Sequence, residues 1–552
     1  MTLSNTQDGD ATRRENIDDL ELESVGYRRE MPRQFSIWSL GALSFTLTCS
    51  WLGTGSSVGI ALMEGSYAGT LWSLPIAGTM TTIVSLGMAE LASAYPVAGA
   101  QYYWAFMVAN DKYKAFASYM NAWMSIIGWW LGAGSVANFV SGMVLDIVLI
   151  WYPGYAFQHW HQYLIYVAII WLAIAINVFA SRLLPLFNKL VFILSVFTLA
   201  GTTITLFVVS RQDHARLSSV FADTKTHSGW KSDGLGFMLS VSNAVFAFLG
   251  SDCGAHLCEE IANPSRNVPM VIVFPLVVGL ITAFPFACAL MYSIKDLDAV
   301  LNSVTGLPLI DVYFQGTRST VAASILLSVF AFCFFGCLVA NGKVITNALE
   351  IYANSMTYLT VTTCSRTLWA VSRDGAIPMG GIWMKVHSTF QMPVNAALLS
   401  GSTTAFSSMV NAAIVFQQTS CIIPQAIILY RGRDSVLPER YFNLGPLGAP
   451  INAVAVAWVV FLDVLYCFPT SMPVTLQNMS YVSVVTVGLV TFIIALWFFN
   501  KRKIFKGPRV DYDLLNIRRM VNLHGGGPSI EATNVETGSI KSQKIGKVDF
   551  DG

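Results

Sequence analysis

The chain has 552 residues, of which 54% are hydrophobic and 12% are charged, and its formal net charge is +1 at pH 7. A water-soluble protein of this length carries more charge on its surface, and a net charge close to zero gives no indication of a nucleic-acid partner. About 20 consecutive apolar residues span a bilayer, and the chain contains about a dozen such stretches. The composition therefore predicts an all-α polytopic membrane protein surrounded by a lipid bilayer.

About 12 transmembrane helices are predicted from the apolar stretches. Residues 1–34 and 508–552 are polar and are predicted to be disordered tails, which leaves 35–507 as one membrane domain. Residues 1–34 also lack the apolar core of a cleavable signal peptide. The predicted helices lie near 35–60, 68–93, 114–148, 160–180, 185–210, 237–262, 268–293, 320–340 with a continuation from 357, 391–407, 409–430, 450–469 and 479–500.

Lysine and arginine are concentrated in alternate loops. They precede the first predicted helix and follow the second, fourth, sixth, eighth, tenth and twelfth, whereas loops 149–162 and 470–478 contain none. Loop 211–233 is a partial exception, but longer loops weigh less in the positive-inside rule. The rule therefore predicts that both termini lie in the cytosol.

The nine cysteines lie mostly inside apolar segments, and no pair has the C-x-x-C spacing of a metal site. They are predicted to pack as small apolar side chains, so neither a metal site nor a cofactor is expected. Motifs of ATP-driven pumps, zinc hydrolases and serine hydrolases are not found in a suitable context. The sequence therefore does not predict an enzyme or a primary pump.

Two predicted helices are interrupted by small and polar residues at mid-bilayer depth. The first contains SWLGTGSS at 50–57, and the sixth contains LGSDCG at 249–254. Such a matched pair of glycine-interrupted segments, five helices apart, indicates an inverted-repeat transporter whose binding site lies at the breaks. Irregular backbone persists at this depth only beside protein or a water-filled cavity, so the glycines are expected to open each helix where a substrate touches the backbone.

Five motifs occur in a fixed order over about residues 35–508. They are SWLGTGSS (50–57), AELASAYPVAGAQYYWA (89–105), AFLGSDCGAHLCEEIANPSRNVP (247–269), SRTLWAVSRDGAIP (365–378) and PVTLQNMSYVSVV (473–485). Together they resemble the amino acid–polyamine–organocation superfamily of permeases, in particular its fungal-type branch of amino acid, γ-aminobutyrate and choline permeases. The resemblance implies a five-plus-five inverted repeat with broken helices 1 and 6, two additional helices, and secondary active transport.

Two segments depart from the pattern of that family. The eighth helix of the family runs without a break into the SR…RDG motif, whereas here the polar residues 342–355 intervene. Residues 392–430 are short for two crossings and a turn, as if residues were missing near 399–401. Helices eight and nine have therefore either diverged or been misassigned in the gene structure, for example by a retained intron. An intact, unspliced reading frame in the RNA would contradict the second explanation.

The residues at the two breaks are the candidate substrate site. Unwound half-helices expose backbone N–H groups that suit a carboxylate and carbonyl groups that suit an ammonium, although Gly, Ser and Thr equally permit close helix packing. Trp51 and Phe248 flank the breaks, and a box of such rings would favour a quaternary ammonium such as choline. The candidates are Ser50, Trp51, Gly53, Thr54, Gly55, Ser56, Phe248, Gly250, Ser251 and Cys253.

Asp252, His256 and Lys189 are the candidates for proton coupling. A carboxylate near the middle of a membrane costs on the order of 3 kcal/mol or more, so Asp252 is expected to carry a proton, as the resemblance also implies. The alternative is that Asp252 is purely structural and accepts hydrogen bonds from the N–H groups of the opened backbone. His256 follows on the same helix face, as a proton relay, a cytosolic gate or part of a polar helix end. The resemblance implies that the positive charge of Lys189 takes the place of a bound sodium ion. The alternative is that the Lys189 side chain extends to the membrane interface.

Three polar residues outside the breaks have weaker assignments. Glu90 and Gln101, in the segment after the second helix, are expected to fix cytosolic loops to a moving helix bundle. Asp463 lies inside the eleventh predicted helix, and its expected role is limited to pairing at a helix or oligomer contact.

The sequence as a whole predicts a secondary active transporter, a proton symporter that imports an amino acid or a related small amine such as γ-aminobutyrate or choline by alternating access. The alternatives are a non-transporting nutrient sensor of the same fold and an inactive permease from a faulty gene structure. The expected location is the plasma membrane, with the vacuolar membrane as the alternative. The substrate, the choice of proton over sodium, and the oligomeric state are left open.

Overall fold

The computed structural model describes residues 49–179, 184–212, 214–256, 258, 262–303, 307–340, 410–475 and 479–508. All regular elements in these residues are helical, which confirms the all-α prediction. The α-helices are α3 (Ser50–Ser56), α4 (Val58–Ala94), α5 (Ala100–Val108), α6 (Lys114–Trp151), α7 (His159–Phe179), α8 (Leu184–Val209), α9 (Leu217–Ala222), α10 (Asp233–Ala244), α11 (Cys253–His256), α12 (Pro264–Ser293), α13 (Leu297–Leu301), α14 (Leu309–Thr317), α15 (Thr320–Ala340), α19 (Val410–Arg431), α20 (Arg433–Val436), α21 (Gly448–Leu465), α22 (Val482–Leu496) and α23 (Arg502–Ile504).

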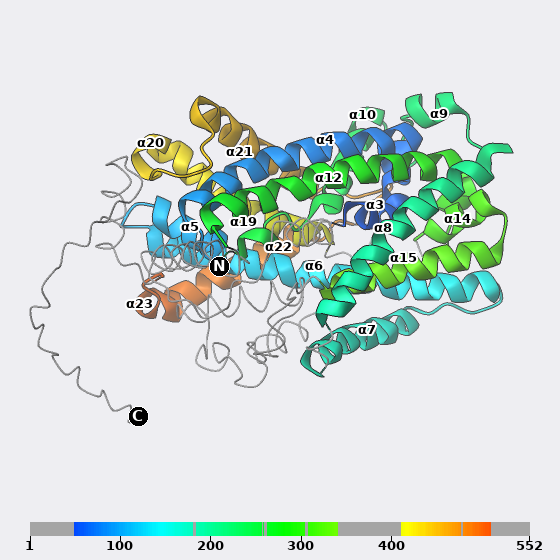
Figure 1. Cartoon of the computed structure of the whole chain (residues 1–552), viewed down its shortest axis with the longest axis horizontal. Coiled ribbons are helices and arrows are strands. Elements are labelled where there is room, and N and C mark those ends of the chain that lie inside the picture. Colours follow the sequence, from blue (N-terminus) through cyan, green and yellow to red (C-terminus); the bar gives the residue numbers. More distant parts are fainter. Residues whose placement is uncertain are drawn as a thin grey trace, which may run out of the picture.

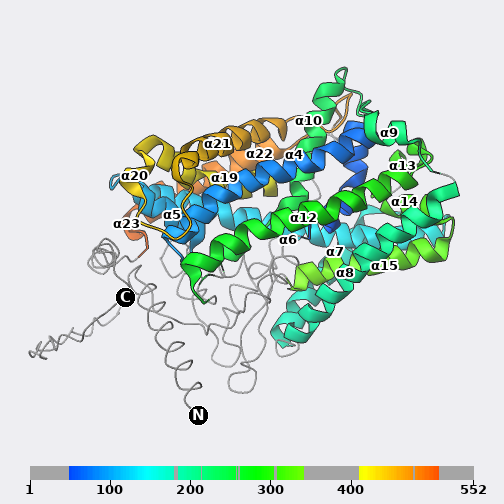
Figure 2. The ribbon, with the colours of Figure 1, turned by 45° about the horizontal axis from the view of Figure 1, so that its top comes forward.

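Within the described ranges, nine helices are long and apolar enough to cross a membrane, and the longest of them run roughly along the long axis of the molecule (Figure 1; Figure 2). This confirms a multi-pass membrane protein. The count of about 12 crossings stays a prediction, because 341–409, with the departures at 342–355 and 399–401, lies outside the described residues. Most of the two predicted tails lies outside them as well.

The bundle has two ends, visible in Figure 1. We call the end that carries α5, α20 and α23 the α20 end, and the end that carries α9 and α14 the α9 end. Under the positive-inside prediction the α20 end faces the cytosol.

The predicted gap between the first two helices, 61–67, is wrong. Helix one consists of α3 and the first turns of α4, and the chain turns only at Ser66, where φ is 54° and ψ is −156°. Ser66 Oγ donates to Asp223 Oδ2 at 3.1 Å, and the Ala68 N–H donates to the Asp223 carbonyl oxygen at 2.9 Å. Because Asp223 accepts hydrogen bonds from both the Ser66 hydroxyl and the Ala68 N–H, the chain turns at a single residue, where the sequence predicts a loop over 61–67.

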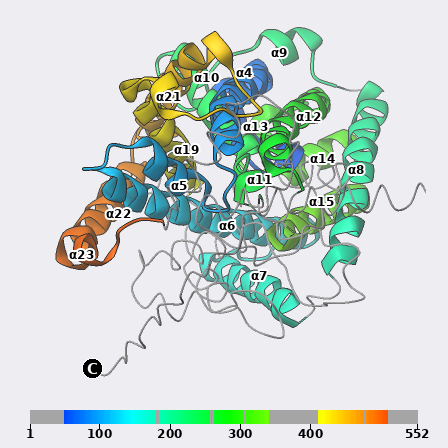
Figure 3. The same cartoon turned by 60° about the vertical axis from the view of Figure 1, so that its left-hand side comes forward.

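Helix one packs directly against helix six, which consists of α10, the 3-10 turn η3 (Val245–Phe248) and α11. A Cβ atom at Gly53 would lie 2.6 Å from Ala247 Cα, and one at Gly55 would lie 2.8 Å from the Phe330 ring. Glycine at both positions therefore permits the close approach of helices, as small residues do in membranes. Figure 3, turned toward the α20 end, shows α11 inside the bundle beside α12.

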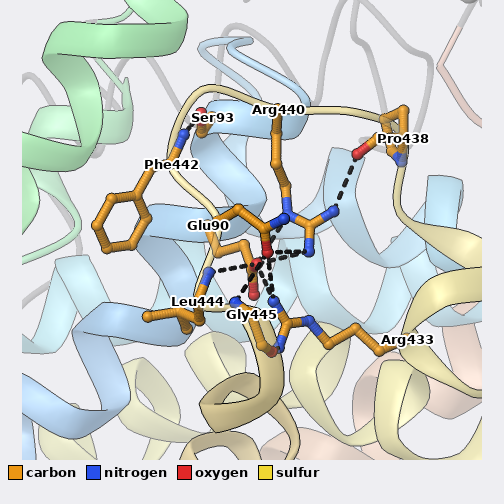
Figure 4. A network of polar contacts seen from close by, with 9 residues as sticks. Glu90, Ser93, Arg433, Pro438, Arg440, Phe442, Leu444 and Gly445 are labelled. Carbon is orange, nitrogen blue, oxygen red and sulfur yellow. Dashed lines mark hydrogen bonds and ion pairs between the residues drawn. The ribbon is translucent and has the colours of Figure 1, made fainter. Parts of the chain in front are cut away.

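At the α20 end, the buried carboxylate of Glu90 in α4 holds the segment between α19 and α21 (Figure 4). Its Oε1 accepts hydrogen bonds from Arg433 Nη2, from Arg440 Nε at 2.7 Å and Nη2 at 2.6 Å, and from the Leu444 N–H at 3.1 Å. The three charged side chains are between 1 and 8% exposed. The prediction that Glu90 fixes a loop is therefore confirmed.

Replacing Glu90 with Gln would leave two buried arginines without their carboxylate, and removing one partner of a buried ion pair costs about 3–5 kcal/mol. We expect Glu90→Gln to lower the free energy of unfolding by about that amount, measured as a lower melting temperature of the purified protein in detergent. Glu439→Gln, at an exposed position in the same segment, is the matched control and should melt like the wild type. Equal melting temperatures for the two variants would contradict a structural role for the Glu90 ion pairs.

Candidate substrate and proton site

Helix six is interrupted between η3, which ends at Phe248, and α11, which begins at Cys253. Gly250 has a φ of 94°, in the left-handed region that favours glycine. The Cys253 N–H then donates to the Gly250 carbonyl oxygen at 3.2 Å, and the Ala255 N–H donates to the Asp252 carbonyl oxygen at 2.9 Å. The predicted break is confirmed, and it turns Asp252 into the core, where the residue is 1% exposed.

One oxygen of the Asp252 carboxylate collects N–H donors from three other helices. Oδ2 accepts from Gln101 Nε2 of α5 at 2.6 Å, from Trp129 Nε1 of α6 at 3.3 Å, and from Gln417 Nε2 of α19. The carbonyl oxygens of both glutamine side chains are buried and have no hydrogen-bond partner in the described part of the chain. Hydrogen bonds to a charged group each contribute about 1.5–3 kcal/mol, so this oxygen is a strong tie between helix six and its neighbours.

His256 lies one turn beyond Asp252 and faces the same oxygen. Its Nε2 is 3.4 Å from Asp252 Oδ2, and its Nδ1 is 2.9 Å from the Ala98 carbonyl oxygen. A carbonyl oxygen only accepts hydrogen bonds, so Nδ1 carries hydrogen and the neutral ring presents a lone pair to the carboxylate. Two facing lone pairs repel, and the contact becomes favourable when one proton sits on either partner. Both side chains are 1% exposed, which shields that proton from solvent.

The hydroxyl groups of helix one are largely satisfied within the helix. Thr54 Oγ1 donates to the Ser50 carbonyl oxygen at 2.8 Å, and Ser56 Oγ donates to the Gly53 carbonyl oxygen at 3.0 Å. Ser50 Oγ is different: it is buried without a hydrogen-bond partner among the residues described. Cys49 precedes it with a φ of 36°, in the left-handed region, so Ser50 is the first residue of the α3 helix.

The two aromatic candidates face different neighbours. The Trp51 ring meets the Phe286 and Phe330 rings edge-on, with centroids 5.5 and 5.1 Å apart. Phe248 instead packs against α4, where a Cβ atom at Gly78 would lie 2.8 Å from its ring. Trp51 of α3, Phe286 of α12 and Phe330 of α15 therefore form one aromatic cluster. Phe248 is not part of this cluster.

The remaining candidates differ in their position. Ser251 and Cys253 flank Asp252 and are buried with it. Lys189 lies on α8 with an exposed side chain, and it takes no part in the hydrogen bonds of Asp252 Oδ2.

In the sequence analysis, Gln101 and Gln417 are not identified as hydrogen-bond partners of Asp252. The role expected for Gln101 is wrong, because its amide donates to Asp252 rather than fixing a loop, and Gln417 is not a candidate there at all. The available signal is chemical: an amide inside an apolar helix needs a hydrogen-bond partner within the bundle. That signal indicates a partner without saying which one.

Residues 35–490 match the family described as amino acid permease. The chain belongs to this family. Among its relatives, the choline transporter of Saccharomyces cerevisiae is 30% identical over 485 residues, which cover 86% of the permease and 82% of the transporter. The amino-acid permease BAT1 of Arabidopsis thaliana is 27% identical over 523 residues, which cover 89% of the permease and 96% of the relative.

Among solved structures, the nucleobase-cation-symport-1 family transporter Mhp1, in a closed conformation with bromovinylhydantoin bound, aligns with a TM-score of 0.44 at 12% identity. The alignment covers 86% of the permease and 95% of that chain. The family and the sequence relatives are permeases and transporters rather than enzymes. The permease is therefore a multi-pass membrane transporter of amino acids or organic cations, as the resemblance implies.

Removing the Gln417 amide takes one N–H donor from Asp252. We expect Gln417→Leu to destabilise the permease by about 1.5–3 kcal/mol, the worth of a hydrogen bond to a charged group, and to lower its melting temperature in detergent accordingly. Gln418→Leu is the matched control, because Gln418 is buried on the same helix and does not bond to Asp252. If Gln418→Leu proves as destabilising as Gln417→Leu, the effect is loss of a glutamine from α19 and not loss of the Asp252 contact.

Proposed function

We propose that the permease imports an amino acid or a related small amine, such as γ-aminobutyrate or choline, together with a proton by alternating access. The observation that carries the proposal is the buried contact between Asp252 Oδ2 and His256 Nε2 at 3.4 Å. This contact favours one shared proton, and ionisable groups buried inside a membrane protein typically belong to ion or proton paths. The pair loads its proton from one side of the membrane and releases it to the other.

The hydrogen bonds of Asp252 supply the link between this proton and movement. While Asp252 is ionised, Gln101, Trp129 and Gln417 donate to one oxygen and hold helix six against α5, α6 and α19. A proton on the carboxyl group removes the charge that strengthens those bonds. Protonation therefore loosens the contact of helix six with its neighbours, which is the change that alternating access needs.

The substrate site proposed for this cycle lies at the two breaks. Ser50 Oγ, unsatisfied among the described residues, and the open backbone at Gly250 are suited to a carboxylate or an amine. The rings of Trp51, Phe286 and Phe330 favour an organic cation through cation–π attraction, which is the basis for choline as a second candidate. A relative that is a choline transporter supports it, and a relative that is an amino-acid permease supports the first.

The remaining expectations are part of the same proposal. Both termini face the cytosol, 1–34 and 508–552 are tails, and the location is the plasma membrane or, alternatively, the vacuolar membrane. Lys189 stays a candidate for charge balance, although its exposed side chain equally suits the membrane interface. A non-transporting nutrient sensor, or a faulty transcript around 342–355, is the competing explanation.

The test is uptake of radiolabelled γ-aminobutyrate, choline and a neutral amino acid mixture into transporter-deficient cells that express this chain, at about pH 5 and about pH 7.5. We expect one substrate to accumulate faster at the acidic pH, because the proton that the symporter carries with the substrate is then more concentrated outside the cell. Asp252→Asn, which cannot exchange a proton at that position, should reduce uptake to background at both values.

Asp434→Asn, at an exposed position in α20, is the matched control and should transport like the wild type. Equal uptake at both pH values together with an active Asp252→Asn variant would contradict proton coupling through Asp252. Absence of uptake for every substrate, with normal expression at the membrane, would favour the sensor or the faulty transcript.

A further inference from the structure

A second buried acid lies at the opposite end of helix one. Glu64 is on the last turn before Ser66, at the α9 end, and is only 3% exposed. Its Oε2 is buried without a hydrogen-bond partner, and the described residues provide no ion pair for it. About ten residues of helix separate it from Gly53, so it lies on the order of 15 Å from the level where helix one meets the break in helix six. An isolated ionised carboxylate in such a place is very costly.

Three hydroxyl groups on the elements around this end of helix one donate to acceptors other than Glu64. Tyr466 donates to the Ser242 carbonyl oxygen at 2.6 Å, and Ser240 Oγ donates to the Ala61 carbonyl oxygen at 3.5 Å. Ser66 Oγ donates to Asp223 at 3.1 Å. None of these three hydroxyl groups stabilises an ionised Glu64.

The neighbouring helix α21, which packs against α4, carries another acid rather than a cation. Asp463 Oδ2 accepts a hydrogen bond from Thr419 Oγ1 at 3.1 Å, and Asp463 Oδ1 has no hydrogen-bond partner in the described residues. The other titratable side chains on the strap and on the elements packed around this end are Tyr67, His214, Arg216, Asp223, Lys225, His227, Lys231, Asp233, Lys295, Asp296, Asp298 and Tyr466.

A strap of residues 214–232, which joins helices five and six, covers this end of helix one. The His227 N–H donates to the Met63 carbonyl oxygen at 2.9 Å, one residue before Glu64. The strap also contacts the segment after α21, because the Met472 N–H donates to the Ser228 carbonyl oxygen at 2.6 Å. Its basic side chains are all exposed, namely His214, Arg216, Lys225, His227 and Lys231. The strap therefore covers Glu64 without burying a positive charge beside it.

We propose that Glu64 is a second proton-binding site, separate from the Asp252–His256 pair, that holds a proton while the strap covers the α9 end. The proton comes from water on that side and adds to the carboxylate, giving a neutral acid that burial tolerates. Lifting the strap rehydrates the group and returns the proton to the same side. Closure of this end of the permease is therefore linked to proton uptake at Glu64, whether or not Asp252 takes part in transport.

The test is infrared difference spectroscopy on the purified full chain in lipid vesicles at neutral pH, following the carbonyl stretch of protonated carboxyl groups and its shift in heavy water. We expect Glu64→Gln to abolish one protonated-carboxyl band that persists in Asp252→Asn and in the exposed control Glu439→Gln. A band that persists unchanged in Glu64→Gln, or that disappears only in Asp252→Asn or Asp463→Asn, would overturn the proposal. Because Asp252→Asn is measured in parallel, the outcome is separate from that of the proposed transport mechanism.

The melting temperature of the Glu64→Gln variant is a second test of the proposal. Glutamine closely mimics a neutral glutamic acid, so Glu64→Gln should melt at the wild-type temperature at neutral pH if Glu64 is protonated there. A large fall in melting temperature would show that the ionised carboxylate is required, which would also overturn the proposal.

Discussion

The structure depends on one carboxylate oxygen, Asp252 Oδ2, which lies where helix six has no regular backbone. Three N–H donors, from α5, α6 and α19, meet at it, and His256 faces it from one turn further on. The cost of placing an acid inside a membrane protein is thereby offset by contacts that join four parts of the chain. The same contacts make the arrangement sensitive to the charge on that oxygen, because hydrogen bonds to an ionised group are roughly twice as strong as neutral ones.

Backbone geometry makes this arrangement possible. Gly250 allows the positive φ that turns Asp252 inward, and Gly53 allows helix one to approach Ala247 just before the break. The glycines of the two breaks therefore have different physical roles: one provides conformational freedom and the other provides space. Both are needed before the buried polar groups of helices one and six can lie side by side in a bundle that is otherwise apolar.

Three acids along the bundle differ in how their charge is compensated. Glu90, at the α20 end, has two arginines within hydrogen-bond distance, while Asp252 has amide and indole donors and one histidine. Glu64, at the α9 end, has no ion pair in the described residues. Removing a partner from a buried ion pair leaves an uncompensated charge, whereas a buried acid without a cation avoids that cost by taking up a proton. The α20 end is thus held by fixed ion pairs, and the two acids without a Lys or Arg partner among the described residues, Asp252 and Glu64, are the ones to which the proposals assign a proton.

The sequence alone determined the membrane class, the family and the position of the helix-six break, because apolar run length, motif order and glycine placement are properties of short segments. It also marked Asp252 as costly enough to need a function. Only the tertiary structure decided which partners satisfy it, since Gln417 lies 165 residues away in the chain, and which residue of helix six Gly53 packs against. The reason is geometric: a helical sequence specifies what a residue must hide or pair, but the neighbouring helix that supplies the partner is set by how the whole bundle packs.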